Sequence, residues 1–267
     1  MAPQQVTCRP RKHHTEVKHG GWHEYLDGVL NLVVNIGFVV GAILFLPGGP
    51  LEVADWMFII CSGVSFMISA RTLLEARNAL KVKLYNRLER DELFETIIFA
   101  VSAIVFFIGT IFFIPGIYGD DKEAAENGEE IGARLFIVGS FGYVMACFFN
   151  AEGMGLNTNA KSSLPEATEC KTYFLHKYGL LMATFGAVFF VVGSVLYRPA
   201  FNTHCDTAAE LNKETCGSTT IFGTYCYIAG ACMYVLQSIL DLTCTVLKHK
   251  TAYQIADESE SGLSDGF

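Results

Sequence analysis

The chain has 267 residues, of which 51% are hydrophobic and 17% are charged, and its net charge is −8. Soluble domains carry roughly 25% charged residues, so this composition favours a membrane protein. The negative charge argues against nucleic acid as a partner, since proteins that bind it carry basic patches. The sequence has no phosphate-binding loop, zinc-ligand spacing or nucleophile elbow. We therefore expect that the protein is not an enzyme and that it has no catalytic residue, cofactor or metal site.

Six apolar stretches predict six membrane-spanning helices, because each reaches the roughly 20 mostly apolar residues that a bilayer requires. They lie at about 26–46, 54–74, 94–114, 132–150, 178–197 and 220–242. The alternative is a soluble helical bundle, whose helices should each show a polar stripe. Ala100–Ile114 and Leu180–Tyr197 contain no charged residue on any face, which opposes that alternative.

The distribution of Lys and Arg predicts the orientation, because cytoplasmic segments of membrane proteins are enriched in these residues. Of the 19 basic residues, 15 lie at the two ends of the chain and in segments 71–93 and 151–177. The alternate loops 47–55, 115–134 and 198–219 hold the other four, together with 11 acidic residues. We therefore expect both termini to be cytoplasmic. The protein would lie in the plasma membrane or in an endomembrane.

An internal repeat is visible in the first, third and fifth spans, each of which has a Gly six residues before a Pro. The pairs are Gly41 and Pro47, Gly109 and Pro115, and Gly193 and Pro199. The Gly would let a neighbouring helix approach closely, and the Pro would end the helix. The partner spans also align, with Met57–Ser62 matching Leu135–Ser140. The sequence therefore predicts an all-α integral membrane protein, with six transmembrane helices arranged as three parallel two-helix repeats.

This repeat divides the chain into seven parts. They are a cytoplasmic basic arm (1–24), hairpin repeat 1 (25–76), an amphipathic cytoplasmic connector (77–92), hairpin repeat 2 (93–152), a cytoplasmic loop (153–176), hairpin repeat 3 (177–245) and a cytoplasmic tail (246–267). The acidic and serine-rich composition of the tail predicts disorder.

The hairpin motifs resemble the YrhK-like domain family. The resemblance rests on Val40–Leu46, Trp56 and Met57–Ser62 in the first repeat. The second repeat carries the pattern best, in Ile108–Phe113 and Leu135–Ser140, whereas the third copy is divergent. The resemblance implies tandem membrane hairpins. It implies no catalytic or binding residue, because the family is functionally uncharacterised.

Polar side chains inside the spans are the candidate functional residues, because such groups are costly in a bilayer. Asp27, Asn31 and Asn35 recur every four residues and therefore share one helical face. Glu95 stands at the position of the second repeat that corresponds to Asp27. The last span adds Gln237 and Asp241 near its cytoplasmic end. These residues either form the mouth of a proton or cation path, or cap helix ends and bond neighbouring helices.

Two cysteines, Cys205 and Cys216, lie in the last outer loop, where oxidation is possible. They are candidates for a disulfide bond that closes a short loop, and two free thiols are the alternative.

Two functions fit these observations. The first is a non-enzymatic protein that organises the membrane or binds partners. Its partners would be the lipid bilayer, other membrane proteins or a second copy of the chain. The second is a transporter or channel for a small solute, a proton or a cation, which would use the polar face of the first span. Polar residues that converge between repeats would favour transport, whereas polar residues at the headgroups would favour the first function.

Overall fold

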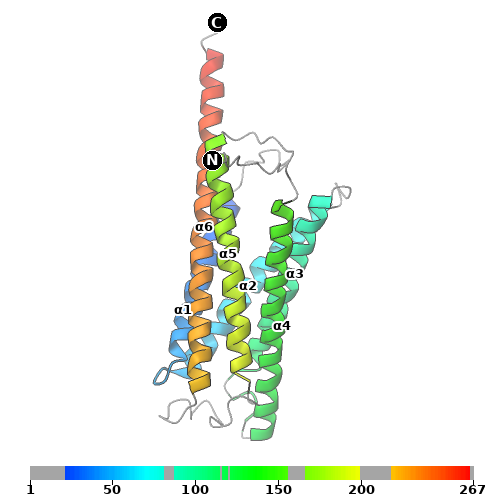
Figure 1. Ribbon diagram of the computed structural model, residues 1–267, viewed down its shortest axis with the longest axis vertical. Coiled ribbons are helices and arrows are strands. Elements are labelled where there is room, and N and C mark those ends of the chain that lie inside the picture. Colours follow the sequence, from blue (N-terminus) through cyan, green and yellow to red (C-terminus); the bar gives the residue numbers. More distant parts are fainter. Residues whose placement is uncertain are drawn as a thin grey trace, which may run out of the picture.

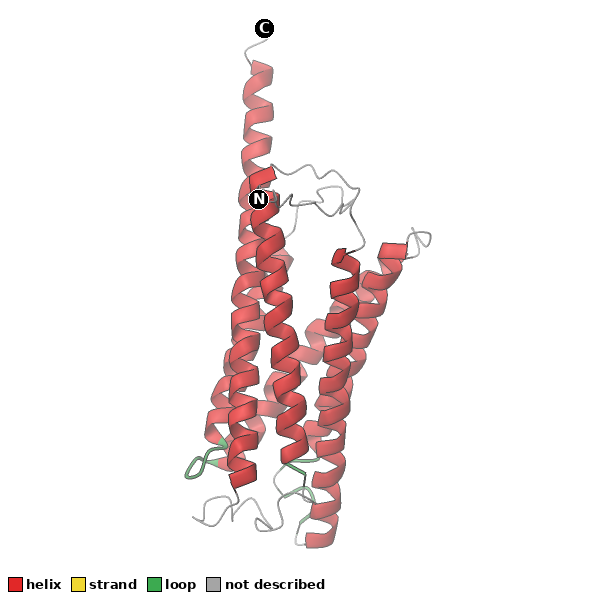
Figure 2. Ribbon diagram, in the orientation of Figure 1, coloured by secondary structure: helices red, strands yellow, loops and turns green. Residues whose placement is uncertain are grey.

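The computed structural model describes residues 22–80, 87–114, 116–119, 121–155, 166–198 and 218–264, and within these ranges the regular elements are all α-helices. The six helices are α1 (Trp22–Leu44), α2 (Leu51–Leu80), α3 (Arg87–Ile111), α4 (Lys122–Gly155), α5 (Glu166–Leu196) and α6 (Ser218–Ser264) (Figures 1 and 2). Four residues of the sequence analysis lie outside the described ranges, namely Pro115, Pro199, Cys205 and Cys216.

Local sequence explains two of the helix boundaries. After α1, Gly48 adopts a φ of 90°, which a residue with a side chain rarely adopts. Pro50 then directly precedes α2, and its carbonyl accepts hydrogen bonds from the amides of Val53 and Ala54. At the start of α4, the Asp121 carboxylate accepts a hydrogen bond of 3.0 Å from the Ala124 amide. Asp121 therefore caps the helix by satisfying an amide that has no partner within it.

Three helices extend well beyond the predicted spans. α4 begins at Lys122 within the predicted outer loop, and α5 begins at Glu166 within the predicted cytoplasmic loop. α6 continues to Ser264, so most of the segment for which composition predicts disorder is helical in the structure. Ala, Glu and Lys are good helix formers, so a helix can continue past its apolar part until a Pro or Gly interrupts it.

The six helices form a closed ring in chain order, in which each helix packs against the next and α6 packs against α1 (Figure 1). The odd-numbered helices run in one direction and the even-numbered helices in the other. The end at which α2 and α6 finish carries Arg71, Lys171, Lys177, Lys248 and Lys250, and we call it the basic end. The opposite end carries Glu52, Asp55, Glu123, Glu126, Glu129 and Glu130, and we call it the acidic end.

Three phenylalanines meet at the centre of the ring, one from each odd-numbered helix. The ring centroids of Phe38 and Phe106 are 6.3 Å apart, those of Phe38 and Phe190 are 6.4 Å apart, and those of Phe106 and Phe190 are 5.9 Å apart. Each also contacts an aromatic ring of an even-numbered helix, and these rings belong to Phe58, Phe136 and Tyr227. We call these six residues the aromatic layer. All six are buried, so the layer fills the middle of the bundle.

Small residues allow the helices to approach closely around the aromatic layer. A Cβ added to Gly41 would lie 2.9 Å from the Phe58 ring, and one added to Gly109 would lie 2.9 Å from the Phe136 ring. At Gly193 an added Cβ would lie 3.2 Å from the carbonyl oxygen of Gly223. Gly41, Gly109 and Gly193 therefore lie where neighbouring helices come close together.

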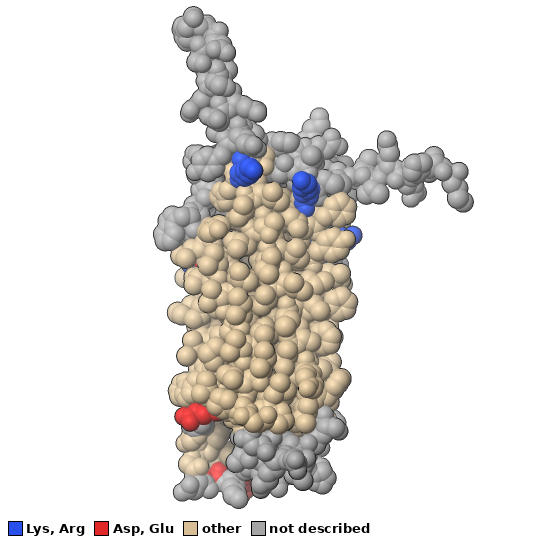
Figure 3. All heavy atoms as spheres, turned by 90° about the vertical axis from the view of Figure 1, so that its left-hand side faces the viewer, with Lys and Arg blue, Asp and Glu red and all other residues tan. Residues whose placement is uncertain are grey.

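Large apolar side chains cover the outside of the bundle. The most exposed include Val33 (59%), Met67 (61%), Val138 (60%) and Phe141 (58%). Figure 3 shows a broad belt without charged residues on one face, with Lys and Arg beyond it toward one end and Asp and Glu toward the other. All six helices are long and apolar enough to cross a membrane.

We predict that Phe190→Ala lowers the free energy of unfolding by about 3–5 kcal/mol, because it leaves a cavity at the centre of the aromatic layer. Thermal unfolding of the purified protein in detergent would measure the loss. Phe141→Ala is the matched control, since Phe141 is 58% exposed and its truncation opens no internal cavity. Equal effects of the two substitutions would contradict this assignment of the core.

Candidate functional site

The polar residues predicted to share a face of the first span have different partners in the structure. Asp27 forms an ion pair of 2.9 Å with Arg71, which joins the start of α1 to the basic end of α2. Both side chains are partly exposed, so the pair contributes at most about 1 kcal/mol to stability. Asn31 lies half-buried on the same helix. The Asp27–Arg71 pair therefore ties together the first hairpin.

Asn35 connects α1 to α6, where the ring of helices closes. Its side-chain amide donates a hydrogen bond of 2.8 Å to the hydroxyl of Ser238 and one of 3.3 Å to the carbonyl oxygen of Tyr234. Ser238 is buried. A polar bond at this position specifies one alignment of the two helices, because any shift would leave buried polar groups without partners.

The two polar residues predicted in the last span contact each other and α5. The side-chain amide of Gln237 donates a hydrogen bond of 3.2 Å to the Asp241 carboxylate. The other carboxylate oxygen of Asp241 lies against α5, 3.1 Å from where a Cβ would stand on Gly179. The third repeat has Gly179 where the first two have Asp27 and Glu95, so the carboxylate of Asp241 occupies space that this glycine leaves open.

The structure thus distributes the six candidate residues over several helix contacts. Asp27 bonds within the first hairpin, Asn35 bonds across the closure of the ring, and Asp241 lies within the third hairpin. Glu95 lies on α3, within electrostatic range of Cys147 on α4. Their arrangement favours the interpretation as interhelical bonds over that of a single shared mouth.

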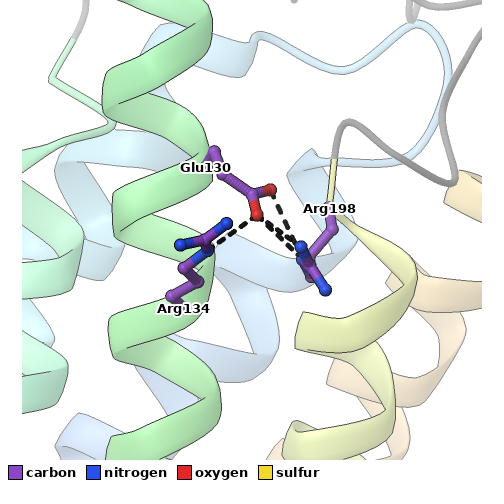
Figure 4. Close-up of polar contacts among 3 residues, drawn as sticks. All are labelled: Glu130, Arg134 and Arg198. Atoms are coloured by element: carbon purple, nitrogen blue, oxygen red, sulfur yellow. Dashed lines mark hydrogen bonds and ion pairs between the residues drawn. The ribbon is translucent and has the colours of Figure 1, made fainter.

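The structure also contains a polar network that sequence reasoning missed. Glu130 of α4 accepts a hydrogen bond of 2.8 Å from Arg134, one turn further along the same helix. It also accepts one of 2.5 Å from Arg198, which follows α5 (Figure 4). The hydrogen bond to Glu130 raises the pKa of Arg198, so this guanidinium stays charged. The four-residue spacing of Glu130 and Arg134 is visible in the sequence, whereas the contact with Arg198 needs the tertiary structure.

Two hydroxyl pairs near the aromatic layer join α5, and Tyr197 directly after it, to α6. The hydroxyls of Ser194 and Tyr227 are 2.9 Å apart, and those of Tyr197 and Thr224 are 2.6 Å apart. Both pairs are buried or half-buried, and both are interhelical bonds. In the described ranges no group of three or more His, Cys, Asp or Glu residues is placed to hold a metal ion.

The fold defines a class of protein, an all-helical bundle whose six helices are apolar and long enough for membrane spans. Within it, residues 175–246 match the model of the family described as YrhK-like protein. This match confirms the resemblance, and it lies on α5 and the first part of α6. The short motifs are closest to the family pattern in the second repeat and divergent in the third, whereas the family model matches the third hairpin. No curated protein and no solved structure matches the chain.

We predict that Asn35→Leu lowers the free energy of unfolding by about 1 kcal/mol, because it removes the bond that joins α1 to α6 and leaves the Ser238 hydroxyl unpaired. A double-mutant cycle with Ser238→Ala, followed by thermal unfolding, would measure the coupling between the two side chains. The second substitution should cost little once the first is present. Strictly additive losses would show that this hydrogen bond does not stabilise the closed ring.

Proposed function

We propose that this protein spans a membrane six times, as three parallel two-helix repeats, with both termini on the cytoplasmic side. The exposed belt of large apolar side chains supports insertion, because a soluble protein rarely exposes so wide an apolar surface. The separation of basic and acidic ends supports the orientation. Protease added to sealed microsomes should digest tags fused to both termini, and protection of either tag would contradict this orientation.

Equivalent positions of the three repeats support the parallel arrangement. Phe106 follows Phe38 by 68 residues and precedes Phe190 by 84, which are the offsets of the repeat prolines. These three residues contact one another at the centre. In the first two repeats, the glycine of the odd-numbered helix also packs against an equivalent phenylalanine of its partner helix, Phe58 or Phe136.

Within the membrane, we propose a non-enzymatic role in organising the bilayer or binding partner proteins. The observation that carries this proposal is the aromatic layer, because it fills the space that a transported solute would have to cross. The interhelical bonds of Asn35 and Asp27 agree with it, since both side chains are used to hold helices together. The outward face is then available to lipid, to other membrane proteins or to a second copy of the chain.

Transport of a small solute, a proton or a cation is the second candidate. One observation favours it, namely that three buried hydroxyls have no hydrogen-bond partner in the described structure, those of Ser62, Ser140 and Tyr234. In a transporter, the aromatic layer would act as a closed gate beside a polar cavity.

We predict that liposomes containing the purified protein show no more proton or monovalent-cation flux under an imposed gradient than empty liposomes. The reason is that the buried aromatic side chains leave no polar path through the centre of the bundle. Vesicle tightness would be checked with an ionophore at the end of each trace. Flux above that of empty vesicles, abolished in an Asp27→Asn/Asn31→Leu variant, would overturn the non-transporting role and identify the mouth of the path.

A further inference from the structure

Three buried hydroxyls are the most unusual polar groups in the described structure. The side-chain oxygens of Ser62, Ser140 and Tyr234 are inaccessible and have no hydrogen-bond partner. They come from α2, α4 and α6, one from each even-numbered helix. A buried hydroxyl without a partner is costly, so such groups are normally satisfied by protein atoms or by ordered water.

All three groups lie on the same side of the aromatic layer. Ser62 and Ser140 each follow an aromatic-layer residue by four positions, namely Phe58 and Phe136, and Tyr234 follows Tyr227 by seven. The even-numbered helices run toward the basic end. At 1.5 Å per residue, the two serines lie about 6 Å beyond the layer in that direction, and the backbone of Tyr234 lies about 10 Å beyond it.

Further polar side chains surround this region. The hydroxyl of Tyr143 on α4 forms a hydrogen bond with Ser65 on α2. One turn further along α4, the Cys147 thiol forms a hydrogen bond with the Thr184 hydroxyl of α5. The Tyr234 hydroxyl, which is wholly buried, lies within electrostatic range of both Cys147 and Tyr143. Hydroxyl and thiol groups from four helices therefore face one region of the interior.

From this juxtaposition we infer that Ser62, Ser140 and Tyr234 line an internal chamber that binds ordered water, between the aromatic layer and the basic end. The lining groups favour a neutral ligand, because they donate and accept hydrogen bonds but carry no charge. A buried water typically makes about three hydrogen bonds, and the hydroxyls of Tyr234 and Tyr143 with the Cys147 thiol can supply them.

The position of Glu95 indicates where the chamber meets the solvent. This carboxylate is half-buried on α3, and it lies within electrostatic range of Cys147. We therefore place the opening of the chamber at the basic end, beside Glu95, with the aromatic layer closing the chamber toward the acidic end. This inference rests on the proposed membrane insertion, but it requires no transport, since a hydrated chamber closed at one end conducts nothing.

The native cysteines test the chamber without any substitution. A small hydrophilic methanethiosulfonate would be added to proteoliposomes, and mass spectrometry of peptides would follow the labelling rate of each cysteine. A thiolate attacks such a reagent and displaces methanesulfinate to form a mixed disulfide, and the thiolate forms only where water reaches the sulfur. We expect Cys147 to be labelled at least about tenfold faster than Cys61 or Cys232, because hydration decides the thiolate fraction.

The labelling of Cys61 and Cys232 distinguishes an incorrect chamber from an incorrect proposal of membrane insertion. Cys61 is buried against Gly37 at the contact between α2 and α1, so its labelling rate reports on a dry helix contact. Cys232 is exposed on α6 in the middle of its apolar span, so lipid should protect it. Labelling of Cys147 as slow as that of Cys61 would overturn the chamber. Rapid labelling of Cys232 would instead contradict membrane insertion.

Tyr234→Phe provides a second and independent test in the full-length protein. If water satisfies the Tyr234 hydroxyl, its removal loses a hydrogen bond and lowers the melting temperature in detergent. If the hydroxyl is truly without a partner, its removal relieves an unfavourable burial and raises the melting temperature. A raised melting temperature would overturn the chamber. Phe141→Tyr, on the exposed face, is the control, because it shows how a tyrosine hydroxyl outside the interior changes the melting temperature.

Discussion

The contact of Phe38, Phe106 and Phe190 is the constraint on which the rest of the bundle depends. Three large rings can meet at the centre only if their helices converge there, so the positions around them must be small. Ala42, Ser140 and Ser194 are accordingly fully buried, and Gly41 and Gly109 have no room for a Cβ. Large apolar side chains are displaced to the outside. The outward apolar belt and the close helix packing are thus two consequences of one arrangement.

Polar bonds then specify which helices are neighbours. Aromatic packing alone tolerates small rotations and shifts, because dispersion is nearly independent of direction. Asn35 bonds α1 to α6, and Glu130 bonds α4 to Arg198 beside α5. These contacts join one hairpin to the next, whereas the Asp27–Arg71 pair acts within the first hairpin. Asp27 and Asn35 thus bond neighbouring helices, and this supports the proposal of a role in packing over one in transport.

The aromatic layer also divides the interior into two unlike parts. Toward the acidic end, hydroxyls such as those of Ser194 and Tyr197 are paired with Tyr227 and Thr224. Toward the basic end, Tyr143 and Ser238 are paired with Ser65 and Asn35, but the hydroxyls of Ser62 and Ser140 have no partner in the described structure. Ordered water in that part would satisfy them at little cost. The same asymmetry would suit a transporter in its closed state, so hydration and flux are separate questions about one region.

The sequence by itself determined the six apolar helices and the charge difference between their two ends, because the hydropathy and the charge of each segment are local properties. It also carried the YrhK-like resemblance, which the third hairpin bears out. Only the tertiary structure decided that Asn35 bonds to Ser238, that Glu130 bonds to Arg198 and that the Tyr234 hydroxyl has no hydrogen-bond partner in the described structure. These residues are far apart along the chain, and no local pattern records which side chains meet after the helices have packed.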